Sequence, residues 1–157
     1  QFIQADAASR HGLILVLGPL RDILSKFSSW KPWSERASLP LTLPGVYLLA
    51  EFKDQAPSGK PALSSKLIYI GETCGQTLHG RLYQFNRSGF LGKLGHSGGA
   101  TFARTYKAQP DPSWLFISVM AVDLEEPHTS AFIRYAERAL LWAYVQHHGA
   151  YPACNRK

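Results

Sequence analysis

Arg81 stands on a helix face whose other residues are apolar. Leu78, Leu82 and Phe85 recur at helical spacing. At roughly 100° per residue, Arg81 falls about 60° from Leu78 and about 40° from Phe85. A long arginine stem can carry its charge out to water from such a position, or pair with a carboxylate. The other interpretation is that the guanidinium is held there for chemistry, which makes Arg81 a candidate site residue.

Glu137 shows the same conflict in the last predicted helix. The apolar residues on its side of that helix are Ile133, Leu140, Leu141 and Tyr144, all within about 60° of it. Arg134, three residues earlier, offers an ion pair worth only about 0.2 to 0.5 kcal/mol when exposed. A metal ion would compensate a partly dry carboxylate better. Glu137 is therefore a candidate metal ligand, with the Arg134 pair as the alternative.

Two tyrosines sit in the strands that precede these helices. Tyr69 belongs to "KLIYIGET", residues 66–73, which alternates like a strand and ends in a turn. Tyr47 belongs to the apolar run 45–50. Tyrosine is a good strand residue, so each alone is consistent with packing. Asn155 lies near the C-terminus, where a polar residue by itself carries little information.

The first half of the chain predicts a helix and a hairpin. Apolar residues at helical spacing follow Pro19 and indicate a short amphipathic helix over 19–27. Prolines mark 30–44 as a connection. Strands are expected over 45–50 and 67–70, joined by a long loop over 53–65. These two strands form an antiparallel hairpin with a long tip.

The second half predicts a helix over 77–86, a loop-rich insertion over 88–112 that contains "GHSGG", and a strand over 114–122. That strand is apolar on both faces and is expected at a central, covered position. The last helix is expected over 131–147, capped by Thr129 or Ser130 and ended by Gly149. The order is typical of an α+β domain, a small sheet with helices against it.

Composition favours one domain and an anionic partner. The chain has 157 residues, 45% of them hydrophobic, and a formal charge of +6, which suits one core and nucleic acid as the first partner to consider. Cys74 and Cys154 form no Cys-x-x-Cys pair, which argues against zinc or a disulfide framework and for a cytoplasmic location. The apolar run 13–17 is too short to span a membrane, and no membrane association is expected. The chain begins with Gln1 rather than Met, which leaves open whether upstream residues are missing.

The order of these residues resembles the GIY-YIG nuclease superfamily. Gly45-Val46-Tyr47 is followed by Tyr69-Ile70-Gly71, then by Arg81, Glu137 and Asn155. The resemblance covers about 44–155 and implies a GIY-YIG-like domain over 44–157, preceded by an N-terminal extension over 1–43. It implies a small central three-stranded antiparallel sheet flanked by helices.

The resemblance also implies an activity, the metal-dependent hydrolysis of phosphodiester bonds in DNA, most naturally double-stranded. By similarity, Tyr47, Tyr69 and Arg81 line a shallow site, Glu137 holds one Mg²⁺ or Mn²⁺, and Asn155 supports the site. Tyr47 would be general base or relay. As a base at neutral pH it would need its pKa lowered by about 3 units from its ordinary value, which Arg81 and a cation would have to supply.

The chain departs from the family pattern in three places. The loop between the two tyrosines is longer than in many members, and so is the segment from Glu137 to Asn155. The histidine that often follows the arginine by one turn is replaced by Phe85. His79 or His96 could substitute in space, and the sequence leaves both open.

Basic residues that could contact phosphates are Lys66, Arg87, Lys93, Arg104 and Lys107. Two other functions stay open. One is a non-catalytic nucleic-acid-binding module that keeps the scaffold, which Phe85 favours. The other is a part of a larger assembly that docks through the helix over 19–27, unless that helix only covers the sheet.

Overall fold

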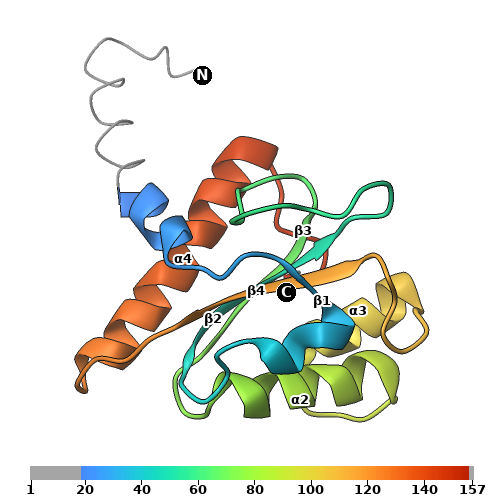
Figure 1. Cartoon of the computed structure of the whole chain (residues 1–157), viewed down its shortest axis with the longest axis horizontal. Coiled ribbons are helices and arrows are strands. Elements are labelled where there is room, and N and C mark those ends of the chain that lie inside the picture. The colour runs from blue at the N-terminus through green and yellow to red at the C-terminus, as the bar shows by residue number, and fades with distance from the viewer. Residues whose placement is uncertain (1–18, 156–157) are drawn as a thin grey trace.

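A four-stranded antiparallel sheet with the order β1-β4-β2-β3 forms the centre of the molecule (Figure 1). This computed structural model describes residues 19–155. The strands are β1 (Lys31–Pro32), β2 (Gly45–Glu51), β3 (Leu67–Thr73) and β4 (Leu115–Ala121). The expected hairpin of β2 and β3 is confirmed, and β4 pairs with the other side of β2.

The prediction of three strands is wrong by one strand. Lys31 and Pro32 pair with Ile117 and Phe116 of β4 and add a fourth strand of two residues. Such a strand shows no alternation of apolar and polar residues, and proline argues against a strand because it has no N–H to donate. The predicted connection over 30–44 therefore holds a short edge strand, followed by the 3-10 helix η1 (Trp33–Ser38).

Three helices follow the hairpin, and the first and the last of them are longer than predicted. They are α2 (Leu78–Phe90), α3 (Ser97–Tyr106) and α4 (His128–His148). The hydroxyl of Thr77 accepts from Gly80 N–H and caps α2, and Gly149 ends α4 in the left-handed conformation. Pro127 precedes α4, so the expected cap at Thr129 or Ser130 is wrong. The Thr129 hydroxyl bonds to the backbone of Leu124 instead.

The expected loop insertion over 88–112 is also wrong, because it contains α3 and the end of α2. The sequence did not predict α3 because its first turn is Ser97-Gly98-Gly99, and glycine and serine are poor helix formers. Close contacts explain the glycines. A Cβ at Gly98 would lie 2.5 Å from the Tyr69 ring, and one at Gly99 would lie 2.8 Å from Ser88 Cβ. Glycine is therefore required for α3 to approach both β3 and α2.

Helices cover both faces of the sheet (Figure 1). One face carries Val46, Leu48 and Ile70 and packs on α4 and on the helical residues 19–25. The other face carries Tyr47, Leu49 and Tyr69 and packs on α2, α3 and η1. Both β2 and β4 are buried along almost their whole length, which confirms that the strand predicted over 114–122 is covered on both faces.

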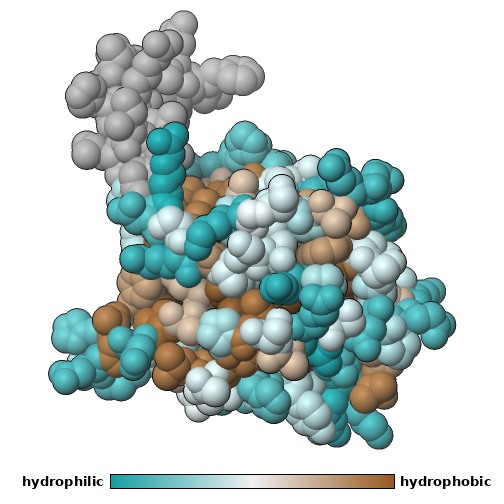
Figure 2. Space-filling model, viewed as in Figure 1, coloured by the Kyte–Doolittle hydropathy of each residue, from teal (hydrophilic) through white to brown (hydrophobic). Residues whose placement is uncertain are grey.

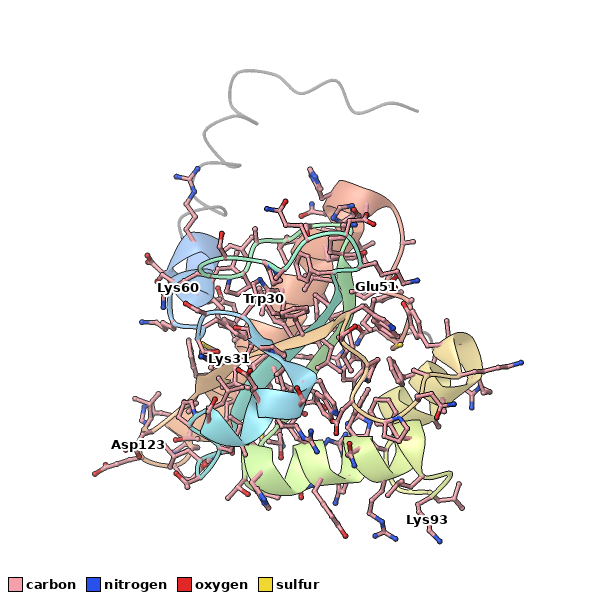
Figure 3. All side chains as sticks on the ribbon, turned by 45° about the vertical axis from the view of Figure 1, so that its right-hand side comes forward. Trp30, Lys31, Glu51, Lys60, Lys93 and Asp123 are labelled. Atoms are coloured by element: carbon pink, nitrogen blue, oxygen red, sulfur yellow. The ribbon has the colours of Figure 1, made fainter. Side chains whose placement is uncertain are left out.

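The N-terminal helix packs onto the core through Leu20, Ile23 and Phe27, all buried. This contact supports the simpler interpretation of that helix, a cover for the sheet rather than a docking surface. Residues 1–18 lie outside the described part of the chain. The long hairpin tip folds back over the same region, where Lys60 Nζ donates to Phe27 O at 2.7 Å and Trp30 packs on Phe52 (Figure 3).

Hydrophilic residues lie along most of the edge of this view, and a group of hydrophobic residues lies at the lower left, where β4 ends and α4 begins (Figure 2). Leu124 lies in that connection and is half exposed. Within residues 19–155, no helix combines the length and the apolar character needed to cross a bilayer.

Candidate active site

The register of β2 and β3 brings the two motif tyrosines together. Tyr47 pairs with Gly71 and Leu49 pairs with Tyr69, so both phenol rings lie on the same face of the sheet. The ring centroids are 5.7 Å apart. A Cβ at Gly71 would lie 2.5 Å from both rings and 2.7 Å from the Tyr47 hydroxyl. Glycine is therefore required at position 71, because the two tyrosine rings occupy the space that a side chain would need.

Gly45, the glycine of the first motif, has a comparable reason to be glycine. A Cβ there would lie 2.1 Å from the backbone oxygen of Met120 on β4 and 3.1 Å from the Leu78 side chain. Any larger residue would push β2 away from β4 at the start of the strand that carries Tyr47. Both motif glycines are thus required by close packing around the tyrosines.

Arg81 lies in the first turns of α2, close to the tyrosines. Its Nη1 donates to Gln84 Oε1 at 3.2 Å, and Gln76 donates to the same oxygen at 3.1 Å. Its Nε is buried and has no hydrogen-bond partner, and it is the one such side-chain nitrogen or oxygen found among residues 19–155. A buried, unpaired donor is costly. The cost of burying this donor is therefore not offset by a hydrogen bond to Nε.

His96 reaches Tyr47 from the N-terminus of α3. Its Nε2 lies 2.7 Å from the Tyr47 hydroxyl, and its Nδ1 accepts from Gly99 N–H at 3.0 Å, which caps α3. The backbone N–H of His96 donates to Ser88 Oγ at 3.1 Å. The side chain is 3% exposed. Of the two histidines that the sequence left open, His96 is the one that contacts the tyrosines.

Phe85, one turn after Arg81, packs on His96. The two ring centroids are 5.2 Å apart with an interplanar angle of 82°. His79, by contrast, has an exposed side chain, and its backbone N–H donates to Leu41 O. The imidazole therefore enters the cluster from α3 while Phe85 supports its face, and the structure gives no role to His79.

Asn155 pairs with the backbone of the second motif. Ile70 N–H donates to Asn155 Oδ1 at 2.8 Å, and Asn155 Nδ2 donates to Ile70 O at 2.7 Å. Cys154 N–H donates to Ile68 O at 2.8 Å, so the C-terminal segment pairs with the outer edge of β3. Asn155 thus fixes the backbone between Tyr69 and Gly71.

Glu137 lies on α4, which covers the opposite face of the sheet from α2 and α3. Its side chain is 14% exposed and forms an ion pair with Arg138 at 3.3 Å, while Arg134 lies beside the Cys74 thiol. The negative charge of Glu137 raises the pKa of Tyr69, which places the carboxylate within electrostatic reach of that phenol. Glu137 therefore approaches the cluster from the other side of β3.

Burial sets the ionisation of the cluster. Desolvation raises the pKa of Tyr47 well above its ordinary value, and the nearby Arg81 charge opposes this without overcoming it. Desolvation also raises the pKa of Tyr69. Arg81 alone therefore does not lower the Tyr47 pKa, as a general base at neutral pH would require. Tyr47 is fully buried and Tyr69 is 8% exposed, so Tyr69 is the phenol nearer to the surface.

A hollow of about 490 Å³ opens beside Tyr69, between α3 and the C-terminal segment. Of the five basic candidates, Arg104 alone lines it, and Asn155 forms part of its wall. Tyr47, Arg81 and Glu137 do not line this hollow. Its full lining is Tyr69, Ser97, Ala100, Thr101, Arg104, Cys154 and Asn155.

The remaining basic candidates lie elsewhere. Lys66 lines a second hollow of about 380 Å³ further along the C-terminal segment, together with Tyr151. The Arg87 guanidinium lies over the Tyr83 ring at 5.7 Å. Lys93 projects outward beyond α2 (Figure 3), and Lys107 is the exposed C-cap of α3. These four residues do not converge on the tyrosine cluster.

A divalent metal would depend on Glu137. Within residues 19–155, no group of three or more His, Cys, Asp or Glu side chains could hold an ion. One carboxylate still suits Mg²⁺, which keeps several waters and takes substrate oxygens as further ligands. The donor chemistry of Glu137 therefore fits a single, weakly held ion that binds together with an anionic substrate.

Sequence reasoning missed the residues that hold the cluster in place. Gln84 binds Arg81, Ser88 binds the His96 backbone, and Ser97 and Thr101 line the hollow. The spacing of Arg81 and Gln84, three residues apart on one helix face, was a usable signal. Ser97 and Thr101 could not be placed because their helix was not recognised.

Comparison with known proteins gave no match, whether to family models, to curated proteins or to solved structures.

Proposed function

We propose that this protein is a metal-dependent endonuclease that hydrolyses phosphodiester bonds in DNA by a GIY-YIG-type mechanism with a single metal ion. The main support is the buried Arg81 Nε without a partner, next to two tyrosines and His96. A guanidinium at this position is suited to a phosphate oxygen, which it can bind through more than one N–H. The net charge of +6 also favours an anionic substrate.

The substrate strand would enter the hollow beside Tyr69. Arg104 on its wall would bind a neighbouring phosphate, and the Tyr69 hydroxyl would orient the attacking water or the scissile phosphate. Arg81 does not line the hollow, so the scissile phosphate would lie at its rim, where Arg81 would stabilise negative charge on the phosphoryl oxygens in the transition state. Water would attack phosphorus in line with the leaving 3′ oxygen, the P–O3′ bond would break, and the proton lost by the water would balance the one taken up by the 3′ oxygen, so that a 3′ hydroxyl and a 5′ phosphate result.

Tyr47 fits the role of relay better than that of base, because its hydroxyl is fully buried and its pKa is raised. Asn155 supports the site by fixing the Ile70 backbone. Glu137 would hold the Mg²⁺ or Mn²⁺. When bound, that ion would supply charge stabilisation for the leaving oxygen.

Cleavage of supercoiled plasmid with Mg²⁺ tests this proposal. We expect nicked and linear products from the wild type. Glu137→Gln and Arg81→Gln should each lower the rate by about 100-fold or more, since each removes a charge that stabilises the transition state. The matched controls are Glu125→Gln and Arg21→Gln, two exposed residues outside the cluster. Full activity in both site variants would contradict the site assignment.

A non-catalytic nucleic-acid-binding module is the second candidate, and the burial of Tyr47 favours it. A phenol that water cannot reach is poorly placed to activate a nucleophile. This function predicts DNA binding that weakens steeply as salt rises, with no cleavage in Mg²⁺ or Mn²⁺. Any cleavage that depends on Glu137 would exclude it.

A further inference from the structure

The ring of His96 is held by a donor on one side and by a hydroxyl on the other. Gly99 N–H points at Nδ1 at 3.0 Å, and the Tyr47 hydroxyl lies 2.7 Å from Nε2. A peptide N–H can only donate. Nδ1 must therefore carry a lone pair and no proton, so the protonation state of one of the two ring nitrogens is fixed.

The second nitrogen follows from the charge of the ring. His96 is 3% exposed, and desolvation, helped by the Arg81 charge, lowers its pKa to about 3. At neutral pH the ring therefore carries a single proton, and that proton must be on Nε2. A neutral histidine in this tautomer donates to Tyr47 and cannot accept a proton from it.

The hydrogen bond from His96 also fixes the direction of the next one. With His96 donating to it, the Tyr47 oxygen acts as an acceptor, and the Tyr47 proton is left for another group. Arg81 has donors only, so it cannot take that proton. The neighbouring oxygen is the Tyr69 hydroxyl, and the hydrogen bond from Tyr47 lowers the pKa of Tyr69 relative to burial alone.

We propose that these groups form a hydrogen-bond chain with one fixed direction, from His96 to Tyr47 to Tyr69, which leaves the Tyr69 proton pointing into the hollow. His96 is then a positioning residue and not a general base. Tyr69 is the hydroxyl that meets the substrate. This inference deepens the proposed endonuclease function and rests on it for the role of Tyr69, while the direction of the first step, from His96 to Tyr47, stands on the two hydrogen bonds of the His96 ring.

His96, the first group of the hydrogen-bond chain, is held by two helices. The His96 backbone N–H donates to Ser88 Oγ on α2, and its ring caps α3. Phe85 packs edge to face on the same ring. The imidazole therefore has no freedom to turn over and exchange its two nitrogens, which is what a chain of fixed direction requires.

The direction can be measured by NMR on protein labelled with ¹⁵N-histidine. The His96 signals are assigned by their loss in His96→Gln. We expect a hydrogen bonded to Nε2 and none on Nδ1 throughout the neutral pH range. A hydrogen on Nδ1, or a ring that is doubly protonated at pH 6 to 7, would overturn the proposal. This result does not depend on whether DNA is cleaved.

Two variants of His96 distinguish its role as a hydrogen-bond donor from a role as a general base. Glutamine can place an amide N–H near the Nε2 position but cannot take up a proton, whereas leucine can do neither. We expect plasmid cleavage by His96→Gln within about 10-fold of the wild type and loss of about 100-fold or more in His96→Leu. A folded His96→Gln that loses about 100-fold or more shows a base and refutes the donor role. If His96→Leu does not fold, His96→Gln alone decides. If the wild type cleaves no DNA, the proposed function fails, and the NMR result still decides the direction of the hydrogen bond between His96 and Tyr47.

Discussion

A methyl group added at Gly71 would collide with both motif tyrosines. The space beside this backbone position is filled by the Tyr47 and Tyr69 rings, each 2.5 Å from where a Cβ would stand. The glycine of the second motif is therefore explained by packing against the two phenols. Its role is independent of any reaction, so it can be tested by stability alone.

Gly71→Ala should destabilise the fold by about 1 to 3 kcal/mol, because over-packing in a buried cluster forces rings off their preferred positions. Urea unfolding followed by tryptophan fluorescence measures the change. Gly75→Ala is the matched control, since a Cβ there meets no atom within 4 Å. Equal stability of the two variants would show that the tyrosines can move apart freely.

At this scale the sequence pointed to some site residues and not to others. Arg81 and Glu137 were found because a charge on an apolar helix stripe is visible from spacing alone. The structure brings Arg81 to the tyrosines and leaves Glu137 on a helix across the sheet. The choice between His79 and His96 could not be made, because His96 reaches Tyr47 across 49 residues and through a helix that the sequence concealed.

At the scale of the elements, the outer edge of β3 is closed by the C-terminal segment. An open strand edge offers unpaired backbone groups. Here Cys154 N–H and the Asn155 side chain satisfy Ile68 O, Ile70 N–H and Ile70 O. The asparagine amide therefore takes the place of a neighbouring strand for the residue between Tyr69 and Gly71.

Asn155→Ala should cost about 1 to 3 kcal/mol, the sum of two hydrogen bonds lost at a partly buried edge. Thermal unfolding gives the overall loss, and hydrogen exchange at the Ile70 amide gives the local one. The Ile70 amide should exchange faster in Asn155→Ala than in Gln109→Ala, an exposed loop control. Unchanged protection at Ile70 would contradict the pairing.

The strands and the long helix followed from local patterns, since alternation and helical spacing reflect burial directly. Two elements did not. β1 has only two residues, one of them proline, and exists because β4 offers it a partner. α3 begins with two glycines that tertiary contacts require and that helix propensity disfavours. The sequence did not predict β1 or α3, because long-range packing forms both elements against the local preferences of their residues.

At the scale of the whole molecule, the buried neutral histidine links acid to stability. His96 has a pKa of about 3 in the folded protein, lowered by burial and by the Arg81 charge, against about 6.5 for an exposed histidine. The groups around its ring are Tyr47, Tyr69, Phe85 and Arg81. None of them supplies a negative charge that would favour the protonated ring at acid or neutral pH.

Stability should therefore fall as the pH drops through the window from about 6.5 to about 3, in which the unfolded chain binds a proton at His96 that the folded protein does not. The slope from this group is at most about 1.4 kcal/mol per pH unit. Urea unfolding between pH 7.5 and pH 4 should show a smaller decrease for His96→Gln than for the wild type and for His79→Gln. A larger decrease for His96→Gln would reverse the assigned sign.

The double role of His96 has a mechanical consequence. One imidazole both starts α3 and holds the Tyr47 hydroxyl, so the tilt of that helix and the alignment of the phenols cannot vary independently. In the proposed endonuclease, a ligand that bound the outer surface of α3 and changed its tilt would also move the phenols. Such a ligand would inhibit the proposed activity without competing with its substrate.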